Sequence, residues 1–291
     1  LRGVRPARAE DGGGDVEVDL NLLYPLSEND GEVTWRAFAR PAKRLREGDN
    51  IKVTATLVGD VMRREGGEVD LLFPLGAADF MAAVEAAGEV PLPPYIARKR
   101  EVSDTDRDRY QTVYAAHSGS VAAPTAGLHF TPAVFEALSA KGIETAEVTL
   151  HVGPGTFLPV TADEIADHKM HSEWGEVTPE VADGVTRAKA EGRRIISVGT
   201  TSTRLLEAAA TGSGELAPFR AATDIFITPG FRFQIVDGLI TNFHLPKSTL
   251  MMLISAFAGV ERVKAAYAAA IEERYRFYSY GDACLLEKSD D

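Results

Sequence analysis

The sequence contains a single cysteine, Cys284. One cysteine excludes an internal disulfide framework and any zinc or iron–sulfur site that needs several cysteine ligands. A chain without disulfides fits a reducing compartment, and we therefore expect a cytoplasmic protein.

Long apolar runs are also missing. The longest, Leu250 to Ala258, is interrupted by Ser255 and is far shorter than the roughly twenty residues that span a bilayer. Apolar residues still make up 45% of the 291 residues. That share is enough for two domains with buried cores, so we expect a soluble globular protein without a membrane role.

Positive charge is scarce, because 31 basic residues stand against 43 acidic ones and give a formal net charge of -12. This balance opposes indiscriminate binding to phosphate backbones, so any contact with nucleic acid must be local. The best candidate lies between Pro94 and Tyr110, although the sequence alone slightly favours a solvated loop of mixed charge for this segment. Its basic residues are Arg98, Lys99, Arg100, Arg107 and Arg109.

The first quarter of the chain has the period of β-strands. Apolar and polar residues alternate from residue 15 to residue 73 without an intervening helix, and Gly66-Gly67 is typical of a hairpin turn. A small antiparallel barrel or sandwich closes such a meander and protects its edges. A helix is expected over Ala77 to Ala87, ended by Gly88.

The proline-rich stretch Pro91-Leu92-Pro93-Pro94 predicts a semi-rigid connector. We place a domain boundary there, with a small antiparallel β-barrel domain over residues 1–90 and an α/β domain over residues 91–291. In the second part helices and strands alternate, which indicates a mixed α/β sheet. One helix is expected after Thr131-Pro132, and two more over Pro179–Ala190 and Ser248–Ala258. Strands are expected over Ala146–Val152 and Arg194–Val198. A hairpin with its turn at Asp237-Gly238 is expected to join the strands Phe233–Val236 and Leu239–Phe243.

All six histidines lie in the second part of the chain, which indicates where the chemistry sits. Thr125, Gly127 and His129 precede a helix, so backbone N–H groups and the Thr125 hydroxyl can face a ligand while Gly127 permits close approach. A helix-entry loop in which His129 caps a neighbour is the alternative. The histidines are His117, His129, His151, His168, His171 and His244.

His151 stands at the end of a predicted strand, before a glycine-rich turn that includes Thr156. Sites of α/β domains lie at the carboxyl ends of strands, so His151 is the first choice for a general acid or base, with a structural histidine as the alternative. His168, His171 and Glu173 are spaced as metal ligands or as a histidine oriented by a carboxylate. A hydrated surface cluster explains them too.

The segment Ser197 to Arg204 places helix N–H groups, hydroxyls and a guanidinium at one strand end, as an anion site would. It lacks the Walker lysine and the dinucleotide glycine spacing, and a tight turn needs no ligand. Two further segments, Thr241–Pro246 and Tyr275–Asp282, combine aromatic and charged residues that can stack on bases. An ordinary core with a polar rim has the same composition.

Taken in order, these segments closely resemble the queuosine-pathway S-adenosylmethionine:tRNA ribosyltransferase-isomerase family. The resemblance implies an α/β domain carrying a small β-barrel. It also implies transfer and isomerisation of the ribosyl group of S-adenosylmethionine onto 7-aminomethyl-7-deazaguanine in tRNA, with release of adenine and methionine and formation of epoxyqueuosine. S-adenosylmethionine is then the ribosyl donor, and no metal is implied. The matching segments are Pro91–Ile96, Tyr110–Ala115, Pro124–Thr131, Thr149–Val160, His168–Glu173, Val198–Arg204, Asn242–Ala258 and Tyr275–Ala283.

Roles for single residues follow from this resemblance as hypotheses. Proton transfer is expected at His151, at His129, or at His171 paired with Glu173. Contacts to S-adenosylmethionine are expected at Thr125, Gly127, Thr156, Thr200, Arg204, Asn242 and His244, and contacts to tRNA at Arg98, Lys99, Arg100, Arg109 and Arg276.

Members of the family have a further amino-terminal segment with an Asn-Asp-Thr-Arg type stretch, and nothing here corresponds to it. The chain opens Leu1-Arg2-Gly3, without an initiating methionine or a signal-peptide pattern, and we expect that an upstream segment is missing. We also expect a monomer.

Two other functions stay open: a metal-dependent hydrolase that uses His168, His171 and Glu173 with His151 or His244, and a non-catalytic RNA-binding module.

Overall fold

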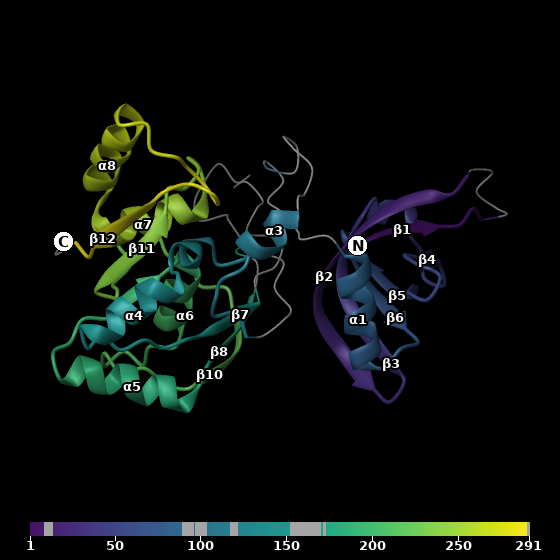
Figure 1. Cartoon of the computed structure of the whole chain (residues 1–291), viewed down its shortest axis with the longest axis horizontal. Coiled ribbons are helices and arrows are strands. Elements are labelled where there is room, and N and C mark those ends of the chain that lie inside the picture. The colour runs from purple at the N-terminus through teal and green to yellow at the C-terminus, as the bar shows by residue number, and fades with distance from the viewer. Residues whose placement is uncertain are drawn as a thin grey trace. The chain divides into compact units, whose positions relative to one another are not determined.

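The computed structural model describes residues 1–8, 14–88, 96, 104–116, 122–151, 170 and 173–289. Its internal contacts divide the chain into two compact units, Leu1–Asp104 with Ser118–Ala122 and Thr105–His117 with Ala123–Asp291. Figure 1 labels most of the helices and strands of each unit. None of the described helices is long and apolar enough to cross a bilayer.

The first unit is a closed antiparallel barrel with the strand order β1-β2-β3-β6-β5-β4. This confirms the predicted barrel and decides against a sandwich. The β5–β6 hairpin turns at Gly66-Gly67, as expected. The strands are β1 (Arg2–Arg5), β2 (Val16–Asn29), β3 (Glu32–Arg40), β4 (Asn50–Lys52), β5 (Val58–Glu65) and β6 (Glu68–Phe73).

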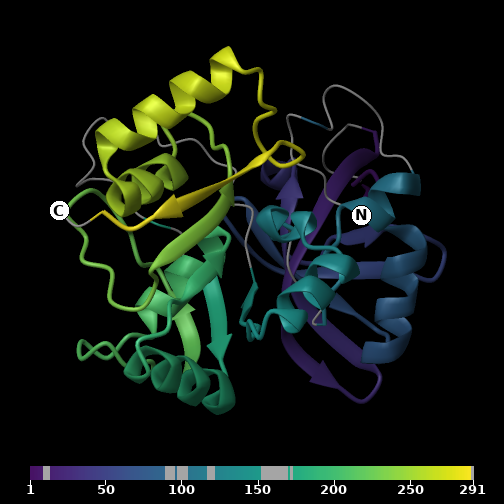
Figure 2. The same ribbon diagram turned by 60° about the vertical axis from the view of Figure 1, so that its left-hand side comes forward.

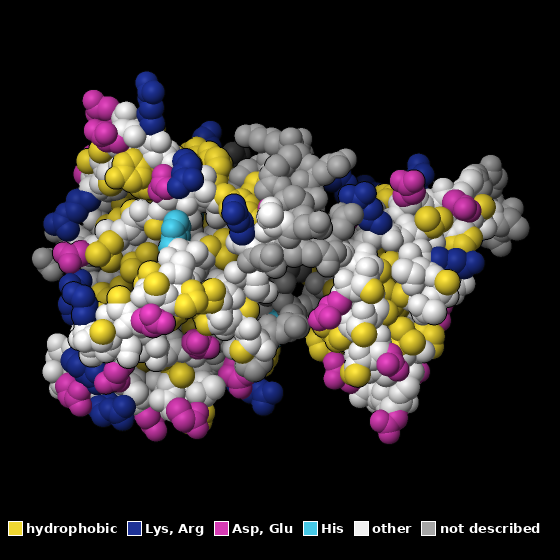
Figure 3. All heavy atoms as spheres, in the orientation of Figure 1, with side chains coloured by type: hydrophobic (Ala, Val, Ile, Leu, Met, Phe, Trp, Pro, Cys, Tyr) yellow, Lys and Arg dark blue, Asp and Glu magenta, His cyan; other side chains and the backbone are white. Residues whose placement is uncertain are grey.

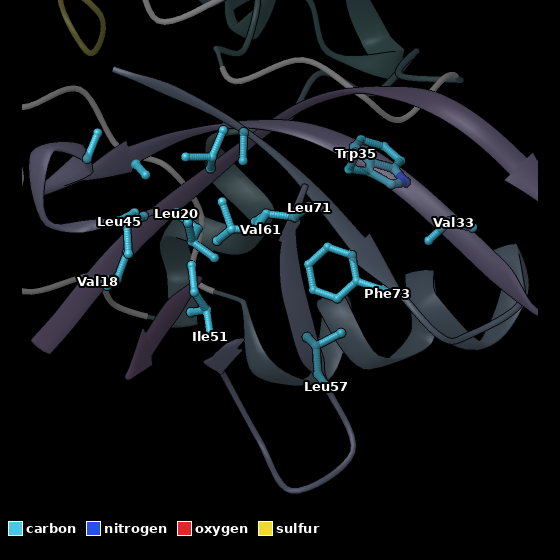
Figure 4. Packing of buried hydrophobic residues seen from close by; sticks show 14 of the residues in the cluster. Val18, Leu20, Val33, Trp35, Leu45, Ile51, Leu57, Val61, Leu71 and Phe73 are labelled. Atoms are coloured by element: carbon cyan, nitrogen blue, oxygen red, sulfur yellow. The ribbon is translucent and has the colours of Figure 1, made fainter. Parts of the chain in front are cut away.

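The barrel core is filled by the inward residues of these strands. Along β3, alternate residues from Val33 to Ala39 are buried, as a strand with one face on a core requires. Figure 4 shows labelled core side chains such as Trp35 and Phe73 on the inner side of the strands. Helix α1 (Ala77–Ala87), which has the predicted bounds, adds Phe80, whose ring lies 4.7 Å from that of Phe73.

The second unit contains two three-stranded sheets with helices, as the predicted mixed α/β class requires. One sheet, β10-β8-β7, is antiparallel; in the other, β12-β11-β9, strand β11 is parallel to β9 and antiparallel to β12. Figure 2 shows β12, the yellow arrow, running beside β11. The strands are β7 (Thr149–His151), β8 (Glu173–Val177), β9 (Ile196–Val198), β10 (Phe219–Thr223), β11 (Gly238–Asn242) and β12 (Ala283–Glu287).

The three helices predicted for this unit are present, at α4, α5 and α7. The Thr131 hydroxyl accepts a hydrogen bond from the Val134 N–H at the start of α4, and Ser248 caps α7 through the Met251 N–H. The predicted helix Pro179–Ala190 is α5 without change. The helices are α3 (Asp104–Arg109), the 3₁₀ helix η2 (Thr125–His129), α4 (Pro132–Ala140), α5 (Pro179–Ala190), α6 (Thr200–Ala208), α7 (Thr249–Ala258) and α8 (Val260–Glu272).

Two predicted strands are shorter in the structure. Strand β7 begins at Thr149 rather than Ala146, and the predicted end at Val152 lies outside the described residues. Strand β9 begins at Ile196 rather than Arg194.

The predicted hairpin at Asp237-Gly238 is wrong. Residues 233–236 form no strand, and β11 pairs with β9 and β12 instead. The backbone N–H groups of Gln234, Ile235 and Val236 donate to the carboxylate of Glu207 on α6, at 2.8, 3.0 and 2.9 Å. A buried carboxylate therefore takes the donors that a hairpin ladder would have used.

We predict that Glu207→Gln destabilises the second unit by about 1.5–3 kcal/mol, since an amide offers one acceptor oxygen where three N–H groups need partners. Hydrogen exchange should quicken at the amides of residues 234–236, and the urea midpoint should fall. Glu272→Gln, at an exposed position on α8, is the matched control. Unchanged exchange at these three amides would contradict the prediction.

Candidate functional site

The second unit contains a pocket of about 350 Å³. Three parts of the chain that are distant in sequence supply its walls: the end of α3 with the residues after it, η2 with its flanks, and the segment between α8 and β12. The lining residues are Arg109, Gln111, Thr112, Val113, Thr125, Leu128, His129, Phe130, Thr131, Arg276, Ser279, Tyr280 and Gly281.

Asn242 lies behind this lining and joins two of its walls. It is the last residue of β11 and is 3% exposed. Its side chain contacts the Thr125 hydroxyl at 3.2 Å, the Nε2 atom of His129 at 3.3 Å and the carbonyl oxygen of Gly281 at 3.4 Å. The structure thus brings together three predicted site residues, Thr125, His129 and Asn242.

Gly127 is required by close packing. A Cβ atom at this position would lie 2.0 Å from the hydroxyl oxygen of Tyr114, so no other residue fits without a shift. Gly127 was predicted to permit close approach of a ligand. Among the described residues, the group that comes this close to Gly127 is the Tyr114 hydroxyl. Burial also raises the pKa of Tyr114 above its usual value, and Glu147 adds to the effect.

The wall formed by residues 276–282 is held in place by charged and aromatic contacts. The Tyr280 hydroxyl donates to buried Asp106 at 2.9 Å, and its ring lies 5.7 Å from that of Tyr110. The Arg276 guanidinium donates to Asp282 at 2.6 Å. This hydrogen bond, with the Arg276 N–H and the nearby His129, holds the pKa of Asp282 below its usual range.

Tyr280 and Gln111 line the pocket but were not among the predicted site residues. Tyr280 lies in Tyr275–Asp282, which was noted for its aromatic and charged residues, and Gln111 lies in Tyr110–Ala115, one of the segments that carry the family resemblance. Only the folded chain shows that these residues share a pocket with His129.

Glu173 and Arg204 form a buried ion pair. The Nη1 atom of Arg204 lies 2.7 Å from a Glu173 oxygen, and the two side chains are 7% and 4% exposed. Arg204 also donates to the carbonyl oxygen of Ile225 at 3.4 Å. Each charge is therefore compensated inside the protein, where an isolated charge would be costly. Thr200, at the start of the same helix, is buried as well.

His151 lies in the same sheet as Glu173, not in the sheet that carries Asn242. It ends the edge strand β7, and its ring is 5.3 Å from that of Trp174. The Arg220 guanidinium lies 5.8 Å from the same indole. His151 is not among the described residues that line the pocket.

His244 is held by two neighbours. Its Nε2 atom is 2.9 Å from the Thr241 hydroxyl, and its backbone N–H donates to the Tyr267 hydroxyl at 2.7 Å. Burial lowers the pKa of His244 from 6.5 to about 4, so the ring is neutral near pH 7. It does not appear among the described pocket-lining residues.

Several predicted site residues lie outside the described residues: Thr156, His168, His171, Arg98, Lys99 and Arg100. Within the described ranges, no three His, Cys, Asp or Glu side chains are grouped so that they could hold a metal ion.

We predict that His244 makes the stability of the second unit depend on pH. The unfolded chain takes up a proton near pH 6.5 and the folded protein only near pH 4, so the free energy of unfolding falls as the pH drops between these values. The slope is at most about 1.4 kcal/mol per pH unit. His244→Gln should flatten it in urea unfolding at pH 7, 6 and 5, and an equal slope in the variant would refute the assignment.

A family model and the sequences of known relatives both match this protein over nearly its whole length. Residues 3–286 match the family model of the "Queuosine biosynthesis protein". The chain is 57% identical over 289 residues to the S-adenosylmethionine:tRNA ribosyltransferase-isomerase of Maricaulis maris, covering 99% of this chain and 81% of that protein. It is 59% identical over 290 residues to the protein of the same name from Allorhizobium ampelinum, covering 100% and 80%.

A crystal structure of the S-adenosylmethionine tRNA ribosyltransferase from Thermotoga maritima aligns with 93% of this chain and 75% of that one, at 31% identity and a TM-score of 0.47. The family model and the sequence identities are sufficient by themselves. The chain belongs to the queuosine biosynthesis protein family.

Proposed function

We propose that this protein transfers and isomerises the ribosyl moiety of S-adenosylmethionine to 7-aminomethyl-7-deazaguanine in tRNA, giving epoxyqueuosine-tRNA with release of adenine and methionine. The observation that carries the proposal is identity above 50% to S-adenosylmethionine:tRNA ribosyltransferase-isomerases over nearly the whole chain. S-adenosylmethionine is then a substrate that is consumed, not a cofactor that is regenerated.

We place the reaction in the pocket around His129. Its volume of about 350 Å³ is in the range typical of small-molecule sites, roughly 300–1,000 Å³. Polar residues from separate walls, including Thr125, Gln111 and Tyr280, line the pocket. Such a set can fix the orientation of a substrate that carries hydroxyl, amino and carboxylate groups. Thr125, Thr156 and Thr200 remain proposed contacts to S-adenosylmethionine.

The chemistry needs a base for the acidic proton beside the sulfonium and a group that helps adenine leave. His129 is the histidine that lines the pocket among the described residues, and we propose it as one of these groups. For the other group, His151 and the pair of His171 with Glu173 remain candidates. Glu173 would act in that role while bound to Arg204.

Contact with tRNA is proposed at Arg109 and Arg276, which line the pocket. Figure 3 shows basic and acidic side chains interspersed on the visible face of the described residues. Two guanidinium groups at the pocket could bind tRNA phosphates locally, although the protein as a whole has a negative net charge. Arg98, Lys99 and Arg100 precede Arg109 in the chain and are proposed as further contacts.

The direct test is incubation with S-adenosylmethionine and tRNA that carries 7-aminomethyl-7-deazaguanine, followed by mass spectrometry. We expect adenine and epoxyqueuosine-tRNA. His129→Ala should lower the rate of adenine release by about 10²–10⁴, the usual contribution of a general acid or base. Folded protein that yields neither product, also when preceded by the amino-terminal segment of a relative, would overturn the proposed function.

For tRNA binding we predict that Arg109→Gln weakens the affinity and lowers its salt dependence by about one counterion. Arg262→Gln is the matched control, because Arg262 is exposed on α8 and does not line the pocket. Filter binding between roughly 50 and 200 mM salt measures both effects. Equal affinity and slope in the two variants would remove Arg109 from the binding surface.

A further inference from the structure

The hydrogen bonds of Asn242 bear on the chemical state of His129. We propose that Asn242 is a positioning residue that holds the neutral His129 ring in one tautomer, with the proton on Nδ1 and the lone pair on Nε2. The tautomer follows from the contacts alone. Its consequence for catalysis rests on the proposed function.

The orientation of the Asn242 amide is determined by two neighbours. The carbonyl oxygen of Gly281 lies 3.4 Å from Nδ2, and a carbonyl only accepts hydrogen bonds, so the amide nitrogen must face it. On the other side the Thr125 hydroxyl donates to Oδ1 at 3.2 Å. A flipped amide would bring two acceptor oxygens together at Gly281, which disfavours it.

The orientation of this amide decides the protonation of the neighbouring ring. An amide nitrogen carries two hydrogens; one is directed to Gly281 and the other to the Nε2 atom of His129, 3.3 Å away. Two donors cannot form a hydrogen bond with each other. Nε2 therefore accepts, and the single proton of the neutral ring resides on Nδ1.

The burial of Asn242 strengthens its control over the tautomer of His129. Asn242 is 3% exposed, so water cannot readily replace a lost hydrogen bond of its amide. A buried donor without a partner costs about 1–3 kcal/mol. The other tautomer would leave Nδ2 of Asn242 facing an N–H group and would carry that cost.

The ring nitrogen left for a substrate is Nδ1. His129 lines the pocket, and no second hydrogen bond to its ring is found among the described residues. A neutral imidazole with the proton on Nδ1 presents a donor there and no lone pair. We infer that His129 donates a hydrogen bond to an atom on which negative charge develops, such as a nitrogen of the departing adenine, and that another group removes the proton beside the sulfonium.

The tautomer can be measured without turnover. The chain labelled with ¹⁵N-histidine gives a long-range ¹H–¹⁵N correlation spectrum in which a protonated and an unprotonated ring nitrogen have clearly different shifts. His129→Gln identifies the signals of His129 among those of the six histidines. At a pH where this ring is neutral, we expect a protonated Nδ1 and an unprotonated Nε2. A protonated Nε2, or averaging of the two tautomers, would overturn the proposal.

Two variants then test the role of Asn242. Asn242→Asp places acceptor oxygens toward Nε2 and should move the proton there. Thr125→Val removes only the donor to Oδ1, so the proton should remain on Nδ1. If Asn242→Asp does not fold, the spectrum of the unchanged chain still decides the tautomer.

Adenine release tests the catalytic consequence separately. Asn242→Asp should lower kcat roughly tenfold or more, with little change in KM for S-adenosylmethionine. A moved proton with unchanged kcat would overturn the inferred role of Nδ1. If the unchanged chain has the expected tautomer but releases no adenine, also when preceded by the amino-terminal segment of a relative, the proposed function fails and the positioning by Asn242 stands.

Discussion

The parallel pairing of β9 with β11 is the constraint on which the candidate site depends. Gly238 lies opposite Ile196, and Ile240 opposite Val198, so both strands end at the same edge of the sheet. Helix α6 begins after Gly199 at this edge, and Asn242 ends β11 there. Since η2 contacts the same edge through Thr125 and His129, the back of the pocket is built where two parallel strands end.

Helix α6 carries the buried charges that connect this edge with the rest of the second unit. Arg204 binds Glu173 on β8, and Glu207 binds the backbone of residues 234–236. A Cβ on Gly175 would lie 2.7 Å from a methyl group of Leu205, so the helix packs directly on β8. Both charges of α6 therefore have a structural partner. Removing Arg204 would leave the buried Glu173 carboxylate unpaired, and removing Glu207 would leave three backbone N–H groups without their acceptor.

Local signals account for what could be predicted about the fold. The cap at Thr131 acts within the first turn of a helix, so the sequence alone located that start. Apolar and polar residues alternate along β3, which indicates a strand with one buried face and led to the prediction of a barrel or sandwich. The hairpin at Asp237 failed because Glu207, some 27 residues earlier in the chain, takes the amides of the segment. A local sequence pattern cannot indicate a hydrogen-bond partner that is so far away in the sequence.

The site was predicted in pieces. Thr125, His129 and Asn242 were each selected, but from separate motifs and with separate roles, and His151 ranked first because it ends a strand. The amide of Asn242 has its two hydrogens directed to Gly281 and His129, and we therefore propose that it acts on a substrate through the histidine. A residue type indicates which hydrogen bonds are possible, whereas the neighbours decide which are already used. The difference between binding a substrate and positioning a catalytic group therefore depends on contacts between segments more than a hundred residues apart.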